Sequence, residues 1–370
     1  MTSATTQLTP PTGLLPRHSL PQVVAEGEIV GSVLAGEKPG QNVSLHPDGR
    51  HLVAQTSGEI VSEAEGVVNV LPILVIDGNV NHVSGNVESA GSILIRGDVQ
   101  QGCSVHSGMS LYVEGSVEAA ELTAHRRVTV LGGMQGNGAS RIVARDTVSL
   151  KFAQHTTITT PGDVVVAGAL AYCQVVCGGR FICQGPGATM GGSVRAGGGA
   201  TFYDLGSSHR VPTQVQVGLD PIAQMRCDRL QEQLHDLRQQ QALEDENARY
   251  LAAAHGMTFP DHVRSIEARI VYRLRQLALP ECPRNQRSLL HREALHLLTT
   301  WGMEHEIETA AACLEEAKRA VRLEPRAEVR VQGSLYPGVE LRIKDATWRS
   351  EQEYFDVTFS YSSEGIVLDS

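Results

Sequence analysis

Three cysteines near the middle of the chain are the first residues whose types and spacing suggest chemistry. Cys173, Cys177 and Cys183 are spaced more widely than the C-x₂-C pair that is typical of zinc sites. Cys183 also falls at a position where neighbouring segments carry valine or leucine, and a thiol can pack as a small apolar side chain. We therefore predict that these cysteines belong to a core and bind no metal. The odd total of seven cysteines indicates reduced thiols rather than a disulfide framework.

The histidines of the second half are the next candidates. His291 and His296 are five residues apart on an expected helix, so their side chains diverge instead of sharing a face. His305 lies between Glu304 and Glu306, in a pattern typical of a solvated charged surface. None of the three is predicted to bind a metal.

Acidic side chains and a glycine-rich run complete the candidates. Asp77, Asp98 and Asp163 lie at expected turns, and turn formation explains them. The run 132–138 is rich in glycine, but no Lys-Ser/Thr pair follows it and no helix is expected there, so we interpret it as a corner. The sequence contains no phosphate loop, nucleophile elbow or dinucleotide fingerprint. We predict no catalytic, cofactor-binding or metal-binding residues, and a protein that is not an enzyme.

Composition narrows the possible partners. The 370 residues carry a net charge of −10 with no strongly basic segment, which argues against nucleic acid or an anionic membrane surface. No apolar run approaches the roughly 20 residues of a membrane span, and the first 20 residues do not resemble a signal peptide. We therefore expect a cytoplasmic protein without direct membrane insertion. Aromatic residues make up only 4% while 37 residues are glycine, which suits a narrow aliphatic core with many tight corners.

A repeat predicts the architecture that positions these residues. Short apolar segments recur at steps of 16 to 20 residues, and each has inward positions two residues apart. The first column contains Ile93, Leu111, Val128, Val148, Val164, Phe181 and Ala200. Six residues upstream lies a second column, made of Val87, Val105, Leu122, Ile142, Ile158, Val175 and Val194. A shorter third column lies six residues downstream and contains Val99, Val117, Met134 and Leu170.

Three inward positions per repeat describe a three-sided coil. We predict a mainly β fold, namely a single-stranded right-handed parallel β-helix with about 17–18 residues per turn, whose turns stack by parallel strand pairing. A β-sandwich is the alternative, but its antiparallel hairpin signals are nearly lacking.

A long helical insertion interrupts this pattern. It begins at Asp220-Pro221, a good cap and first helical position. Helical spacing of apolar residues predicts helices over 222–255, about 260–279 and about 284–323. The first and third have similar lengths, which suits an antiparallel coiled-coil hairpin. Such a hairpin serves as a binding surface or as a structural spacer, and the sequence leaves both open.

Strand signals return after the insertion, and weaker ones precede the repeat. The predicted divisions are a disordered terminus at 1–20, a small β cap at 21–70, the β-helix at 71–219, the helical hairpin at 220–325 and C-terminal strands that pack back on the β-helix at 326–370.

Several motifs in this order resemble the flagellar assembly protein A (FapA) family. They are Val75-Ile76-Asp77-Gly78-Asn79-Val80, Ser84-Gly85-Asn86-Val87, Ile95-Arg96-Gly97-Asp98-Val99, Gly132-Gly133-Met134-Gln135-Gly136, Val217-Gly218-Leu219-Asp220-Pro221 and Tyr336-Pro337-Gly338-Val339. The resemblance covers about residues 30–365 and implies a right-handed β-helix with a coiled-coil insertion. The chain departs from the family pattern in having little room for a further N-terminal domain. It also carries Arg126-Arg127 where a glycine pair is usual.

The resemblance implies a non-enzymatic scaffold or regulatory factor in flagellar assembly or cell-surface organisation. We expect the chain to bind protein partners. A second copy of the chain could be such a partner, because the end strands offer unpaired backbone groups. Two alternatives stay open: a polysaccharide-acting β-helix enzyme and a bactofilin-like filament.

Overall fold

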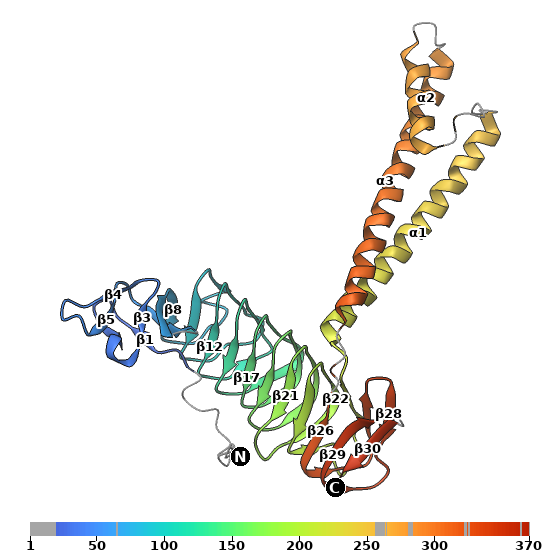
Figure 1. Cartoon of the computed structure of the whole chain (residues 1–370). Coiled ribbons are helices and arrows are strands. Elements are labelled where there is room, and N and C mark those ends of the chain that lie inside the picture. Colours follow the sequence, from blue (N-terminus) through green and yellow to red (C-terminus); the bar gives the residue numbers. More distant parts are fainter. Residues whose placement is uncertain are drawn as a thin grey trace, which may run out of the picture. The chain divides into compact units, whose positions relative to one another are not determined.

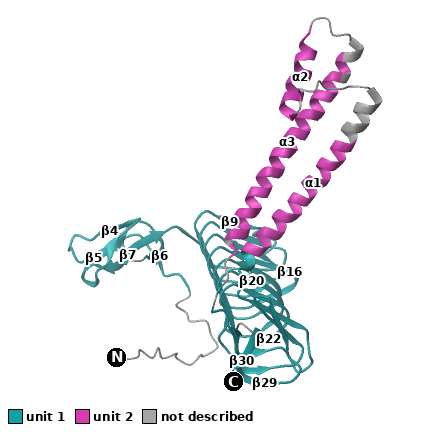
Figure 2. Ribbon diagram, turned by 45° about the vertical axis from the view of Figure 1, so that its right-hand side comes forward, with its two compact units in different colours: residues 1–222, 322–370 teal, residues 223–321 magenta. Residues whose placement is uncertain are grey.

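The computed structural model describes residues 20–63, 66–255, 263, 265–279, 284–321, 324, 326–362 and 365–369, without the side chains of 247–255, 284–286, 289 and 320. The predicted disordered terminus and Cys282 therefore lie outside the described residues, apart from residue 20. The chain forms two compact units (Figure 2). We call residues 1–222 and 322–370 the solenoid unit, and residues 223–321 the helical unit.

The solenoid unit contains a column of stacked coils (Figure 1), as the repeat predicts. Parallel pairing joins each coil to the next through about eight turns. The first face is built from β8 (Ile73–Ile76), β10 (Ser92–Ile95), β12 (Leu111–Val113), β15 (Val128–Val130), β17 (Val148–Leu150), β19 (Val164–Val166), β21 (Arg180–Cys183) and β23 (Gly199–Phe202). The other faces use β9 (Val87–Ser89), β11 (Ser104–Ser107), β13 (Val117–Glu118), β14 (Glu121–Ala124), β16 (Met134–Ala144), β18 (Ala153–Thr160), β20 (Leu170–Cys177), β22 (Ala188–Ala196), β24 (Asp204–Leu205) and β25 (Thr213–Val217).

Strand registers confirm the predicted columns. Ile93 pairs with Leu111, Leu111 with Val128, and the series continues to Phe181 and Ala200. The second column pairs in the same way from Val87 to Val194. These side chains are buried in one apolar core, except that Val87 in an early coil is only partly buried.

The glycine-rich run differs from its predicted role. The bend lies at Leu131 and Gly132, while β16 begins at Met134 and continues through Gly136 and Gly138. Its pairing with β18 is irregular between Gln135 and Ser140. The extra residues are therefore taken up as an irregularity within a strand, which also explains the longest step of the repeat.

The N-terminal strands form two small sheets that are separate from the large sheet of the solenoid. One contains β1 (Val23–Val24), β3 (Lys38–Pro39), β6 (Gly58–Ser62) and β7 (Val67–Leu71). The other contains β2 (Ile29–Ser32), β4 (Val43–Leu45) and β5 (His51–Ala54), with the short 3₁₀ helix η2 (Val33–Ala35) after β2. Leu52, Val68 and Val70 are at the centre of their shared apolar cluster.

The C-terminal strands extend the last coils and then change direction. They are β26 (Val329–Leu335), β27 (Val339–Ile343), β28 (Ala346–Arg349), β29 (Tyr354–Ser362) and β30 (Gly365–Asp369). β26 and β27 pair in parallel with β23 and β25, whereas β28, β29 and β30 form antiparallel pairs. Trp348 packs on Phe359 with ring centroids 4.7 Å apart, so aromatic rings cover the end of the aliphatic core.

The insertion between β25 and β26 contains three helices, α1 (Pro221–His255), α2 (Ile266–Ala278) and α3 (Arg284–Ala320). Cys227, Leu234, Leu314 and Ala317 form an apolar cluster between α1 and α3. Glu244, further along α1, is paired with His296, nearer the start of α3, so the two helices run antiparallel. The coiled-coil geometry of this pair stays a prediction. No helix in the described part of the chain is both long enough and apolar enough to cross a membrane.

Candidate interaction surfaces and binding site

The three central cysteines lie in the solenoid core. Cys173, Cys177 and Cys183 are all buried. Burial raises the pKa of Cys173 to about 11 and that of Cys177 to about 12, so both are protonated thiols at neutral pH. A protonated thiol is a poor nucleophile and a poor metal ligand. Their positions favour packing, as expected from the Cys183 column.

The corner aspartates bind backbone groups of the next coil. Asp98 Oδ1 accepts a hydrogen bond of 2.7 Å from the backbone N–H of Ser116, and Asp163 Oδ1 accepts one of 2.7 Å from Arg180. Asp204 does the same for Ser334 at 2.8 Å. Asp77 differs, because it pairs with the Arg96 side chain at 2.6 Å. Turn formation therefore explains these residues only in part, since several of them also join successive coils.

Asp163→Ala is expected to lower the free energy of unfolding by about 1–2 kcal/mol, because the Arg180 N–H loses a charge-assisted partner at a crowded corner. Asp163→Asn is the matched control. Its amide oxygen still accepts the bond, as that of Asn79 does for the Asp98 N–H at 2.8 Å, so a smaller loss is expected. Urea unfolding of both variants measures the difference. Equal losses would show that the hydrogen bond contributes little.

The candidate histidines of the helical unit do not form a ligand set. His296 Nδ1 lies 3.2 Å from a carboxylate oxygen of Glu244 and joins α3 to α1. His291 and His305 are exposed. His291 and His296 therefore lie in different surroundings, because His296 contacts α1 whereas His291 is exposed.

A polar pocket in the solenoid unit was not predicted. It encloses about 510 Å³ and brings together the chain around residues 20–22, strand β6 and two coils of the solenoid. Glu59 from β6 is only 2% exposed, and Ser92 Oγ donates to its Oε1 at 3.0 Å. Its other oxygen, Oε2, has no hydrogen-bond partner among the described residues. Arg126 and Arg127 line the same pocket, and the charges of both act on the buried Glu59 carboxyl group.

Burial is the largest influence on Glu59 and raises its pKa, while the Ser92 hydrogen bond and the charge of Arg126 act in the opposite direction. Tyr112, also in the pocket, has its pKa raised by burial and then by the charge of Glu59. The pocket therefore holds a carboxyl group that takes up a proton more readily in the folded chain than in the unfolded one.

Glu59→Gln is expected to remove a pH-dependent loss of stability. A raised carboxyl pKa contributes stability below the unfolded value of about 4.3, and this contribution disappears as the pH rises through the higher folded value. The wild-type chain should therefore lose stability relative to the variant between pH 4 and neutral pH. Urea unfolding of both proteins across this range tests it, and parallel pH curves would contradict it.

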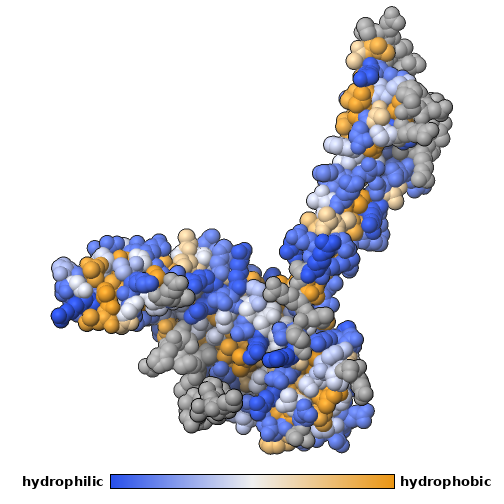
Figure 3. All heavy atoms as spheres, viewed as in Figure 1, coloured by the Kyte–Doolittle hydropathy of each residue, from blue (hydrophilic) through white to orange (hydrophobic). Residues whose placement is uncertain are grey.

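The helical unit carries apolar side chains on its surface (Figure 3). On α3, Leu295, Leu298 and Trp301 are 52%, 42% and 45% exposed and lie three residues apart, so they share one face. On α2, Val271 and Leu274 are also exposed and share that spacing. We call Leu295, Leu298 and Trp301 the α3 face.

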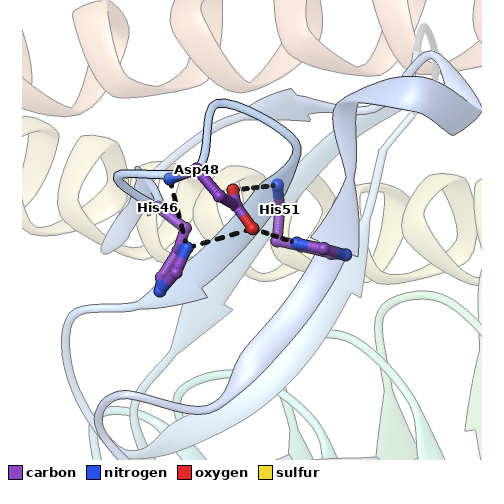
Figure 4. Close-up of side chains that lie close together, drawn as sticks. All are labelled: His46, Asp48 and His51. Carbon is purple, nitrogen blue, oxygen red and sulfur yellow. Dashed lines mark hydrogen bonds and ion pairs between the residues drawn. The ribbon is translucent and has the colours of Figure 1, made fainter.

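Sequence reasoning also passed over a group in the small sheets. His46, Asp48 and His51 converge at the turn between β4 and β5 (Figure 4). The signal that would have found them is the Pro-Asp-Gly turn flanked by histidines, at residues 46–51.

Comparison with known proteins identifies the family. The model of the flagellar assembly protein A β-solenoid domain matches residues 72–367. No curated protein and no solved structure matches the chain. The matched region covers well over half of the sequence, and its fold is the stacked parallel solenoid described above. The chain therefore belongs to the FapA family.

Proposed function

We propose that this chain is a non-enzymatic assembly factor that works in the cytoplasm by binding other proteins, in flagellar assembly or in cell-surface organisation. Family membership supports an assembly role. The carboxylates that a polysaccharide-acting enzyme would use, such as Asp98 and Asp163, are occupied with backbone N–H groups at separate corners. We also propose the predicted divisions, from the β cap at 21–70 to the C-terminal strands at 326–370, as the domains of the chain.

The observation that carries the proposal is the α3 face. Three large apolar side chains on one helix surface are typical of a protein-binding site, and tryptophan is enriched among residues that dominate binding energy. The solenoid core, by contrast, has its aliphatic columns buried, apart from the partly buried Val87. We therefore propose that the helical unit supplies the partner contact and that the solenoid is its rigid support.

Removing the helical unit tests this directly. Its two ends are adjacent, because the Glu324 N–H donates to the Gly218 carbonyl at 3.2 Å. A short Gly-Ser linker in place of residues 223–321 should therefore leave the solenoid folded. Proteins that co-purify with the full chain from cells of the source organism should be lost with this deletion.

Two point variants refine the test. Leu298→Ser combined with Trp301→Ser should also release the partner, because both side chains belong to the α3 face. Glu308→Ser, an exposed charged position on the same helix, is the matched control and should retain it. A partner that stays bound to the deletion variant would show that the helical unit is only a spacer. Light scattering across concentration separates a soluble factor from a filament, which would scatter increasingly.

A further inference from the structure

A histidine–aspartate–histidine group projects from one β-hairpin (Figure 4). Asp48 Oδ2 lies 2.5 Å from Nδ1 of His51 and 3.2 Å from Nδ1 of His46. One ligand atom from each of the three residues lies within 4.8 Å of the others. In the described ranges this is the only group of three or more His, Cys, Asp or Glu side chains that comes so close.

The backbone holds these three side chains in place. The Gly49 N–H donates to the His46 carbonyl at 2.9 Å, and the His46 N–H donates to the His51 carbonyl at 2.8 Å. Gly49 has a φ of 68°, which is the left-handed conformation that this turn requires and that glycine adopts without strain. Pro47 fixes φ at the first central position of the turn. The hairpin is therefore closed on both sides of Asp48.

Hydrogen bonds also orient the carboxylate. Asp48 Oδ1 accepts the backbone N–H groups of Arg50 at 2.8 Å and His51 at 3.1 Å. This leaves Oδ2 directed at the two imidazole rings.

We propose that His46, Asp48 and His51 bind a divalent late transition-metal ion, with Zn²⁺ as the physiological choice. Two imidazole nitrogens and one carboxylate oxygen suit Zn²⁺, Ni²⁺ or Cu²⁺, whereas Mg²⁺ and Ca²⁺ prefer oxygen ligands alone. Tetrahedral zinc with bonds of 2.0–2.1 Å places its ligand atoms about 3.3 Å apart. The 3.2 Å separation of His46 and Asp48 already fits this spacing.

Two separations must still adjust: the ligand atoms of His46 and His51 lie within 4.8 Å of each other, and the His51–Asp48 pair is too short. The shorter His51–Asp48 pair must open by about 0.8 Å to reach the tetrahedral spacing. Both side chains are partly exposed, at 41% and 34%, so they have room to rotate about their side-chain bonds. Three protein ligands leave a fourth position for water. The bound ion cross-links the two sides of the β4–β5 turn. This role is independent of the partner contact proposed for the helical unit.

Zinc alone is the probe for the test, titrated into the full-length reduced chain against a chromophoric chelator. We expect one site whose affinity falls at least about tenfold in His46→Ala, His51→Ala and Asp48→Asn. Asp48→Asn separates binding from folding, because its amide oxygen still accepts the Arg50 and His51 N–H groups while the charged ligand is lost. The matched control is His106→Ala with His125→Ala, a pair of rings 5.6 Å apart that lies outside the group.

X-ray absorption of the zinc complex identifies the ligands. Nitrogen and oxygen ligands, together with loss of the site in the three variants but not in the control, would support the proposal. Sulfur ligands would place the zinc on cysteines and overturn it. Zinc affinity unchanged in the three variants, or no zinc uptake by the wild-type chain at millimolar zinc, would overturn it as well.

Discussion

Gly162→Ala is expected to lower the free energy of unfolding of the solenoid by about 3 kcal/mol or more. A Cβ at this position would fall against the carbonyl oxygen of Asp146 in the preceding coil. The obstacle is backbone and not a flexible side chain, so the two coils must separate. The same Asp146 carbonyl also accepts the Thr160 hydroxyl at 2.7 Å, and this bond is lost if the coils move apart.

Gly78→Ala is the matched control for this effect. Gly78 also lies at a bend of the solenoid, but an added Cβ there meets no atom within 4 Å and its φ is not in the left-handed region. We expect a change of no more than about 1 kcal/mol, in the stabilising direction if the unfolded chain loses freedom. Urea unfolding followed by circular dichroism compares the two variants. Equal stabilities would contradict the close stacking of coils at residue 162.

Glu293→Ala is expected to destabilise the helical unit by about 3–5 kcal/mol. The side chain of Arg273 on α2 is only 4% exposed, and its Nε lies 2.9 Å from Oε2 of Glu293 on α3. Its Nη2 also donates to Oε1 of the same carboxylate at 3.0 Å. Removing the carboxylate leaves a buried guanidinium without its main counter-charge. Thermal unfolding followed at a helical wavelength measures the loss.

Two further variants show whether burial is the reason. Glu315→Ala removes the exposed ion pair with Lys318 and should change stability little, because solvent screens that pair. Arg273→Met combined with Glu293→Leu should recover most of the loss, since an apolar pair of similar volume avoids the cost of burying charge. A double variant as unstable as Glu293→Ala would contradict this account.

The solenoid was predictable because its signal repeats. A single aliphatic residue predicts little about the fold. The common spacing of Val105, Leu122, Ile142 and Ile158, however, indicates which side chains face inward and which strands pair. Parallel stacking then follows. The strands of one coil lie on different faces, so each pairs with the strand on the same face of the next coil, which runs in the same direction. The irregular coil at β16 was the exception, since extra residues can lengthen a corner or a strand equally well.

The polar sites were not predictable in the same way. The pocket around Glu59 joins a residue of the small sheets to Arg126, which lies 67 positions away in the sequence. Arg273 and Glu293 are likewise on different helices, and their pairing depends on a packing angle that the apolar pattern does not specify. Only the His46–His51 turn had a local signal, and there the chemistry depends on side-chain orientation.

Site-specific photo-cross-linking in cells tests the central claim, that a protein partner binds the helical unit. A photoreactive phenylalanine analogue at Leu298 should give one discrete adduct that Trp301→Ser abolishes. The same analogue at Gln174, an exposed position on the solenoid, should give none. An adduct from Gln174 with none from Leu298 would contradict the claim and place the partner on the solenoid.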